Sequence, residues 1–322
     1  MKNNPKGICV LAGMFMLFFI YFSSPKIAIA QPIDGEQAAL LIAYAQLEGL
    51  INGNHQRALE ILDQIIGQGI NDLFHKAGAY YVRSALRAEI GQMHEALNDI
   101  RRSIVLFPNT AISYELLAFI YTQMKHHSAA LDAINRAIEL EPWQLSFYVN
   151  RAVIQMNLYQ FDKAIADLTH VLSIDPYYPR ALAHKAPVYM HIGDFQSALS
   201  YISQAIKLYS ASRDFFRIRG IVNYYLGNYN HALMDYNKAL ELNRFDTAAF
   251  IRRGLLYNRM GRNSEALYDL NRALLLSPHN FVIYRHRAMV HLDMDNLTAA
   301  VNDLGKYARL SDNKSAIRNI MR

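Results

Sequence analysis

A 34-residue period runs without insertion or deletion from Ala77 to Lys314, a span of 238 residues that holds seven copies of one unit. One column of this repeat contains only alanine, at Ala96, Ala130, Ala164, Ala198, Ala232, Ala266 and Ala300. Twelve residues earlier, a second column contains only small residues, at Ser84, Ala118, Ala152, Ala186, Gly220, Gly254 and Ala288. A fixed period of this length indicates stacked copies of one supersecondary unit. The chain is therefore predicted to fold as a solenoid, in which each unit packs mainly on its neighbours.

Each unit contains two segments with helical spacing. In residues 109–142, one helix face contains Tyr114, Leu117, Ala118 and Tyr121, which follow the i, i+3, i+4, i+7 rule. A second apolar face runs from Ala130 to Leu140, after polar residues that mark a turn. Pro142 ends the unit, because proline cannot continue a helix. The unit is therefore predicted to be a pair of antiparallel helices.

Further columns support one family. Aromatic residues recur at Tyr80, Tyr114, Tyr148, Phe216, Phe250 and Tyr284, turn glycines at Gly91, Gly193, Gly227 and Gly261, and prolines at Pro108, Pro142, Pro176 and Pro278. With the small-residue columns, this unit resembles the tetratricopeptide repeat. The resemblance covers the seven in-phase units and a weaker eighth unit at about residues 39–72, offset by four residues. It implies an all-α fold, a right-handed α-solenoid of about eight helix-turn-helix repeats.

The first 30 residues predict a secretory signal peptide. Lys2 and Lys6 precede an apolar stretch of 15 residues from Ile8 to Phe22, and a small-x-small cleavage pattern ends at Ala30. We expect cleavage after Ala30 and an exported protein, periplasmic or secreted. The alternative is a signal retained as a membrane anchor, although 15 apolar residues are fewer than the roughly 20 that span a bilayer.

The rest of the chain is expected to contain a divergent first repeat and connection (31–76), seven in-phase units (77–314) and a short C-terminal cap (315–322). The cap would use Ile317, Ile320 and Met321 to cover the last unit. The formal net charge is +6, and without the three lysines of the signal the balance is 30 basic against 27 acidic residues. This weak excess does not favour a nucleic-acid partner.

A pair of charged columns is predicted to be structural. Arginine occurs at Arg83, Arg151, Arg219, Arg253 and Arg287, and aspartate 16 residues later at Asp99, Asp167, Asp235, Asp269 and Asp303. The two units that lack the arginine, at Leu117 and Lys185, also lack the aspartate, at Ala133 and Tyr201. We therefore expect partly buried ion pairs that bridge the two helices of a unit, because a semi-buried charge needs a partner. The alternative is a row of ligand-binding arginines.

The resemblance also implies where a partner binds. In such superhelices the first helix of each unit lines a concave groove, and the ninth residue of the unit points into it. Counted from Ala77, that column is apolar throughout, at Ala85, Phe119, Val153, Pro187, Ile221, Leu255 and Met289. Nearby groove positions are Tyr81, Glu115, Thr122, Met156, Met190, Arg217, Tyr224, Arg252, Asn258, Arg259 and Arg285. An apolar floor with a basic C-terminal half fits a protein or peptide segment with apolar anchors and some acidic residues. The alternative is that a tight superhelix packs the stripe against itself.

Two further observations concern the predicted groove. Members of the family that bind chaperone tails hold a carboxylate with Lys and Asn at the fifth and ninth positions of one unit. Asn150 and Arg180 match part of that clamp, but Glu115 and Phe119 stand where the Lys and Asn are required, so we do not assign this specificity. Pro187 lies inside a predicted helix, which we expect to kink there and form either a shaped pocket or a local bend.

Several chemistries have no support in the sequence. The single cysteine, Cys9, lies in the predicted signal, so the mature chain would have no thiol. The twelve histidines include His126-His127, the pair His184 and His191, and His286, but none has ligand spacing with carboxylates. No phosphate-binding glycine loop or hydrolase motif occurs. We therefore expect no enzyme, no cofactor and no metal site.

These observations predict a non-enzymatic, protein-binding adaptor or scaffold that docks a partner segment in its groove, in assembly or maintenance of the cell envelope. Two alternatives stay open. One is a structural scaffold that self-associates through its ends into a homo-oligomer, and the other is a secreted effector that binds host proteins. Contact with a membrane is expected only through an uncleaved signal.

Overall fold

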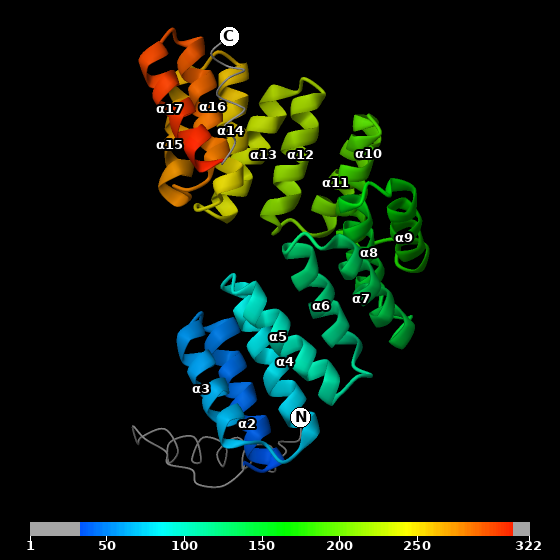
Figure 1. The fold of residues 1–322 in the computed structure, drawn as a ribbon. Helices are drawn as coiled ribbons and strands as arrows, with labels where there is room; N and C mark the ends of the chain where they lie inside the picture. The colour runs from blue at the N-terminus through cyan, green and yellow to red at the C-terminus, as the bar shows by residue number, and fades with distance from the viewer. Residues whose placement is uncertain (1–32, 312–322) are drawn as a thin grey trace, which may run out of the picture. The chain divides into compact units, whose positions relative to one another are not determined.

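The computed structural model describes residues 33–311, which form sixteen α-helices and one π-helical segment (Figure 1). No strand occurs among these residues, where Ile33 and Ile70 form an isolated β-bridge. The predicted all-α solenoid of helical hairpins is confirmed. The predicted signal peptide, Cys9 and the predicted cap lie outside the described residues. The chain divides into two compact units, one up to Pro142 and one from Trp143.

The first unit contains three hairpins and part of the irregular N-terminal region. Its helices are α2 (Gly35–Gln46), η1 (Leu47–Ile51), α3 (His55–Gln68), α4 (Leu73–Glu89), α5 (Met93–Leu106), α6 (Ala111–Gln123) and α7 (His127–Leu140). The hairpin of α2 and α3 stands where the sequence predicts the divergent first repeat. There, the π-helical segment η1 extends α2, and Gly49 lies against the Leu86 side chain, which leaves no space for a Cβ.

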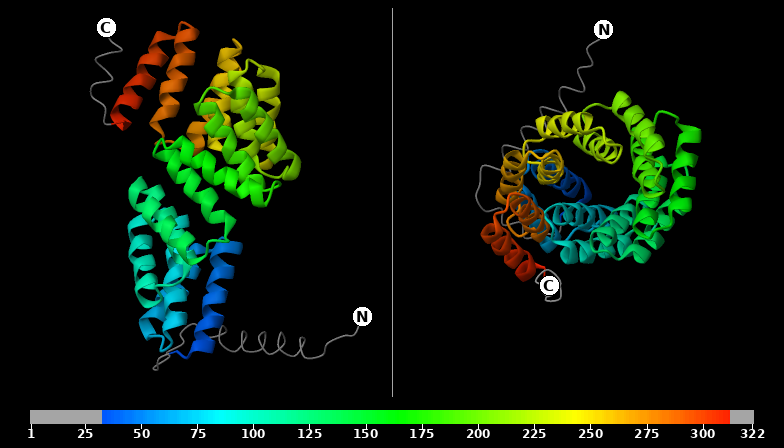
Figure 2. Two further views of the ribbon diagram at one scale, coloured as in Figure 1. Left: turned by 90° about the vertical axis from the view of Figure 1, so that its right-hand side faces the viewer. Right: turned by 90° about the horizontal axis from the view of Figure 1, so that it is seen from above.

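The second unit contains five hairpins that follow an arc (Figure 2). Its helices are α8 (Leu145–Asn157), α9 (Phe161–Ile174), α10 (Pro179–His191), α11 (Phe195–Leu208), α12 (Arg213–Tyr225), α13 (Tyr229–Leu242), α14 (Thr247–Arg259), α15 (Asn263–Leu276), α16 (Phe281–Asp293) and α17 (Leu297–Leu310). Each second helix packs on its own partner and on the first helix of the next hairpin. Successive first helices also pack on one another, so they form the inner side of the arc.

The small-residue columns are the helix crossings. All seven alanines of the first column are fully buried, and the residues of the second column are buried as well. At Ser84 the hydroxyl donates to the backbone oxygen of Ala96 at 2.8 Å, so the polar atom is satisfied inside the crossing. Small side chains are required here because the two backbones pass close to each other.

The turns between the two helices of a hairpin require a left-handed backbone. The turn glycines have positive φ, for example 83° at Gly91 and 77° at Gly227. Where another residue replaces glycine, the backbone keeps this conformation, with φ of 61° at Lys125, 58° at Tyr159 and 58° at Asp295. The stacking therefore imposes the turn geometry even on residues that adopt it at a cost of roughly 1 kcal/mol.

All five predicted arginine–aspartate pairs form, each with two parallel N–H···O contacts. Arg253 donates from Nε and Nη2 to the two carboxylate oxygens of Asp269 at 2.7 and 2.8 Å, and Asp269 is fully buried. Each arginine also lies over the aromatic ring three residues before it, such as Phe250 at 5.8 Å from the Arg253 guanidinium. The prediction of a structural pair is thus confirmed, and the stacked ring shields its outer face.

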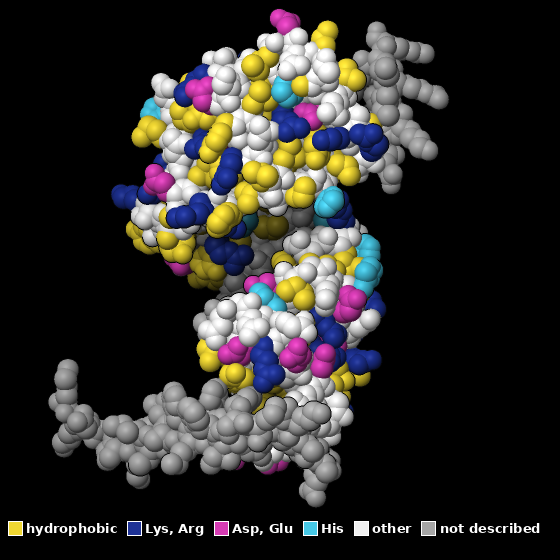
Figure 3. Space-filling view, turned by 90° about the vertical axis from the view of Figure 1, so that its left-hand side faces the viewer, with side chains coloured by type: hydrophobic (Ala, Val, Ile, Leu, Met, Phe, Trp, Pro, Cys, Tyr) yellow, Lys and Arg dark blue, Asp and Glu magenta, His cyan; other side chains and the backbone are white. Residues whose placement is uncertain are grey.

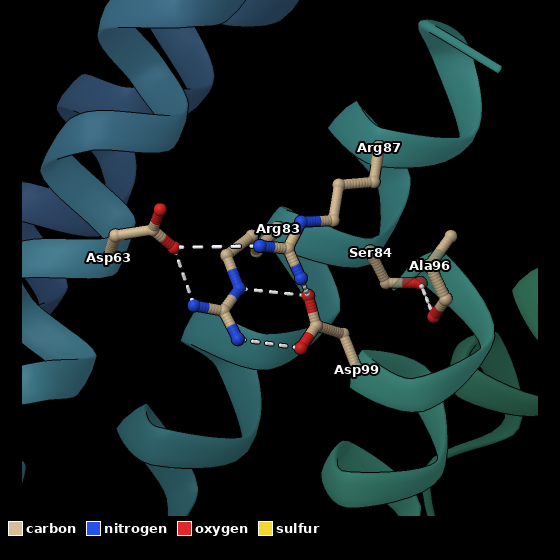
Figure 4. A network of polar contacts seen from close by, with 6 residues as sticks. All are labelled: Asp63, Arg83, Ser84, Arg87, Ala96 and Asp99. Atoms are coloured by element: carbon tan, nitrogen blue, oxygen red, sulfur yellow. Dashed lines mark hydrogen bonds and ion pairs between the residues drawn. The ribbon is translucent and has the colours of Figure 1, made fainter. Parts of the chain in front are cut away.

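Some of these arginines also join one hairpin to the preceding one. Arg253 donates from Nη1 to Asn237 on α13 at 2.6 Å, and Arg287 makes the same contact with Asn271 on α15. In the first unit, Arg83 connects Asp99 on α5 with Asp63 on α3, and Arg87 adds a second contact to Asp99 (Figure 4). The guanidinium therefore acts within the hairpin and across the stacking interface.

Two of the seven 34-residue repeats lack the arginine–aspartate pair, and other residues fill the two positions. Lys185 is 7% exposed and lies 5.0 Å from the ring centroid of Tyr201, the residue that replaces aspartate. Burial lowers the pKa of Lys185, and the ring face supplies the favourable electrostatic contact. In the hairpin of α6 and α7 both positions are apolar, Leu117 and Ala133. A buried charge at this position is thus matched either by an opposite charge or by a ring face, and where the first helix has no charge the second has none either.

We predict that Arg219→Ala destabilises the protein by about 3 kcal/mol, because it leaves the carboxylate of Asp235 buried without its cation. The double change Arg219→Met with Asp235→Leu should recover most of this loss, because no charge then stays buried. Thermal melting of the full chain measures both. Lys238→Ala, which breaks the exposed pair with Glu241, is the control and should cost less than about 0.5 kcal/mol. Unchanged melting of Arg219→Ala would contradict a structural role.

Candidate functional site

The ninth residues of the seven 34-residue repeats all lie on the surface of the first helices of their hairpins. Each follows a buried residue of the second small column, yet none is itself buried. Phe119 is 47% exposed and Met289 is 50% exposed, although both are large and apolar. The packing between hairpins therefore does not bury the residues of this column. We use "inner face" for the surface of the first helices that contains this column.

In the first unit, the inner face contains Tyr81, Ala85, Glu115, Phe119 and Thr122. Burial and the charge of Glu115 raise the pKa of Tyr81, so α4 and α6 bring these two side chains together. The Thr122 hydroxyl donates to the Ala118 backbone oxygen at 2.8 Å and is not available to a partner. The exposed Phe119 is the main apolar feature of this stretch.

In the second unit, the inner face begins with Val153 and Met156 on α8 and continues with Pro187 and Met190 on α10. All four are half-buried. Helix α10 continues through Pro187 to His191, so the proline does not end the helix. The predicted kink and pocket at this position stay a prediction.

The last three first helices combine apolar and basic side chains. Ile221, Leu255 and Met289 stand in the ninth column of α12, α14 and α16, with Tyr224 beside Ile221. Further residues predicted for the groove are Arg217 on α12, Arg252, Asn258 and Arg259 on α14, and Arg285 on α16. Figure 3 shows Lys and Arg side chains interspersed with hydrophobic ones over the second unit. The basic residues predicted for the C-terminal half of the groove therefore belong to first helices that pack on one another.

These cations differ in how they are paired. Arg217 contacts Asp214 at 2.6 Å and Asp246 at 3.4 Å, so its charge is compensated. Arg259 donates to the Tyr229 hydroxyl at 3.4 Å. Arg252 and Arg285 are both exposed, and neither forms an ion pair with a carboxylate within residues 33–311.

The residues that match part of the carboxylate clamp are engaged with each other. Arg180 donates from Nη2 to the Asn150 side-chain oxygen at 2.9 Å. Burial lowers the pKa of His184 to about 4, and the charge of Arg180 adds to this effect. His184 is therefore neutral at physiological pH and is a poor substitute for the second basic residue of the clamp. The clamp specificity is accordingly not assigned to this chain.

Sequence reasoning missed one feature of this region. Tyr236 on α13 is 1% exposed and stands in a column that otherwise contains only isoleucine and leucine. Its ring fits because α12 has Gly220 at the crossing, where an added Cβ would lie 2.5 Å from the ring atom Cε1. The coincidence of the largest residue in one column with glycine in the facing column was the available signal. The pair fixes how α12 packs on α13 beneath Ile221.

Comparison with known proteins identifies the repeat. Tetratricopeptide repeat models match residues 111–142, 145–178 and 184–247. A tetratricopeptide repeat protein from Parabacteroides merdae is 17% identical with a TM-score of 0.66, and the match covers 80% of this chain and 99% of that one. Yeast Tom70 is 18% identical with a TM-score of 0.64, over 96% of this chain and 71% of that one. No curated protein matches the sequence.

A third structure, the Cut9 and Hcn1 hetero-tetramer of the APC/C, is 19% identical with a TM-score of 0.65. This match covers 88% of the present chain and 56% of that chain, so the present chain spans little more than half of its length. At these identities the likeness concerns the fold. The chain is a tetratricopeptide repeat protein, and such repeats support a role as a protein-interaction adaptor or scaffold.

Two searches of the described residues bear on other kinds of site. Within residues 33–311, no helix is both long and apolar enough to cross a membrane. The same residues contain no group of three or more His, Cys, Asp or Glu side chains arranged to hold a metal ion.

We predict that stability falls between about pH 6.5 and pH 4 through His184 and His286. Burial lowers the pKa of both side chains to about 4, and the charges of Arg285 and Arg252 contribute at His286. An unfolded histidine titrates near about 6.5, so the unfolded chain binds more protons in this window and gains relative to the folded chain. The double variant His184→Gln, His286→Gln should lose less melting temperature than the parent on going from pH 7 to pH 4.5. The exposed His94→Gln is the control, and an identical fall in all three would contradict the prediction.

We predict that Gly220→Ala destabilises the protein by about 1–3 kcal/mol, because the new Cβ overlaps the Tyr236 ring. Adding Tyr236→Leu should restore stability. Gly78→Ala, at a helical glycine with nothing within 4 Å, is the matched control and should instead stabilise by roughly 1 kcal/mol. Chemical denaturation measures all three, and equal effects of the two glycine changes would contradict the prediction.

Proposed function

We propose that the protein is an adaptor that docks a segment of a partner protein on the inner face of its second unit. The observation that supports this is the ninth column, which is apolar in every unit and half-buried or exposed in every unit. Contiguous apolar surface of this kind, edged by charged groups, is typical of interaction sites. The partner segment would offer apolar anchors to Ile221, Leu255 and Met289 and acidic groups to the neighbouring arginines.

We further propose that the protein works outside the cytoplasm, in the periplasm or after secretion, in assembly or maintenance of the cell envelope. This rests on the predicted signal peptide of residues 1–30. No catalytic role is proposed, because tetratricopeptide repeats generally serve as scaffolds for other proteins.

Self-association is the second candidate, and one observation favours it. Val301 on α17 is 65% exposed, whereas the same column in the six preceding hairpins is buried or half-buried. Leu304 is likewise half-buried in a column that is otherwise fully buried. The last second helix therefore presents, among the described residues, the surface on which another first helix would pack. Sedimentation that stays monomeric at high concentration would count against this candidate.

The adaptor proposal is tested by placing a photo-crosslinking residue at Ile221 in living cells and identifying the product by mass spectrometry. We expect one dominant adduct with another protein. The same residue at Met234, which is exposed on the second helix α13, is the control and should not yield that adduct. The adduct at Ile221 should also decrease when Leu255 and Met289 are replaced by glutamate, because these side chains belong to the same surface.

Identical adducts at Ile221 and Met234 would contradict docking on the inner face. Adducts only between two copies of this chain would favour self-association.

A further inference from the structure

This inference rests on the proposed function and concerns one place on the inner face. Arg252 is the sixth residue of its unit and Arg285 is the fifth residue of the next, and the helices that contain them, α14 and α16, pack on each other. Both side chains are exposed, and both act electrostatically on the ring of His286. Two exposed guanidinium groups thus belong to helices that pack on each other.

Neither charge of this pair is compensated by a carboxylate, in contrast to the charges of Arg253 and Arg287 on the same two helices. Arg219, Arg253 and Arg287 each bind an aspartate within their hairpin, and Arg217 binds Asp214 and Asp246. Within the described chain, neither Arg252 nor Arg285 has a carboxylate partner. The only acid on α16 is Asp293, eight residues beyond Arg285 and about 12 Å farther along the helix axis.

His286 adds no countercharge. Its pKa is lowered to about 4, first by burial and then by the charges of Arg285 and Arg252. The ring is therefore neutral at physiological pH, and its Nδ1 is buried without a hydrogen-bond partner. Neither arginine therefore finds a countercharge in this ring, and an anion from a partner could supply one.

Apolar side chains flank the two arginines on the same helix faces. Leu255 is three residues from Arg252, and Met289 is four residues from Arg285, spacings that place each pair on one face. A bound anion at this position would therefore lie beside apolar side chains. A docked segment that covers them would exclude water and strengthen charge-assisted hydrogen bonds to the anion. Guanidinium groups present a planar fork that matches the two oxygens of a carboxylate or phosphate.

We propose that Arg252 and Arg285 form a receptor for one oxyanion group of the docked segment, a carboxylate or a phosphate ester, set between apolar anchors that contact Leu255 and Met289. The site selects the charge of the partner, while the ninth column supplies the apolar contact. Arg217 contributes less, because Asp214 and Asp246 already hold it.

The test uses three synthetic peptide mixtures of equal length and the purified full chain on a surface. Each mixture has Leu, Ile, Met and Phe randomised at the flanking positions and one fixed central residue, which is glutamate, phosphoserine or glutamine. We expect the glutamate or the phosphoserine mixture to be retained about tenfold more than the glutamine mixture. A preference for phosphoserine over glutamate identifies a phosphate site, and equal retention of these two identifies a site for either oxyanion.

Arg252→Gln and Arg285→Gln should each remove this preference and leave retention of the glutamine mixture unchanged. Arg309→Gln, at an exposed arginine on α17, is the matched control and should leave the preference intact. Arg252→Lys keeps the charge without the planar fork and should retain only part of the preference.

Equal retention of the three mixtures would overturn the anion receptor and leave the adaptor proposal standing. A preference that survives both glutamine variants would also overturn the assignment to these arginines. Retention of none of the mixtures, with folding verified by melting, would count against the receptor and against docking of short apolar segments together.

Discussion

In most hairpins of this solenoid, the packing of the two helices depends on a buried aspartate and the arginine that pairs with it. In five hairpins an aspartate lies inside the packing of the two helices, and it is stable there only because an arginine from the first helix satisfies both of its oxygens. Three of these guanidinium groups also reach the preceding hairpin. Arg253 contacts Asn237, Arg287 contacts Asn271 and Arg83 contacts Asp63. One residue therefore fixes the spacing within a hairpin and the register between hairpins, which apolar contacts alone define less sharply.

The exceptions show that the requirement is electrical and not merely steric. Where tyrosine replaces aspartate at Tyr201, the cation becomes Lys185, and the ring face takes the place of the carboxylate. Where alanine replaces aspartate at Ala133, the partner is the neutral Leu117. No described hairpin retains one charge of this pair without a matching group. A neutral hairpin and a charged hairpin can thus alternate in one array without loss of the common geometry.

This arrangement determines which cations a partner can use. The arginines at the seventh position of five repeats pair with buried aspartates, so they form no row of ligand-binding groups. Cations at the fifth and sixth positions are not used in this way, but among these Arg217 is already held by two aspartates. Arg252 and Arg285 have no carboxylate partner among the described residues. Because they lie on the same helix faces as Leu255 and Met289, a partner could meet charged and apolar groups at one place.

The sequence by itself determined the helical hairpins, their number, the buried columns and the arginine–aspartate pairs, because a strict period repeats each packing contact seven times and makes a matched gain or loss visible. It also determined that the ninth column is apolar. The tertiary structure alone decided which inner-face cations are compensated, since Asp246 caps α14 and still reaches Arg217 on α12, a contact across 29 residues that no repeat column encodes. It likewise revealed Tyr236 packed against Gly220, because such a fit depends on distances between two helices and not on the period of either.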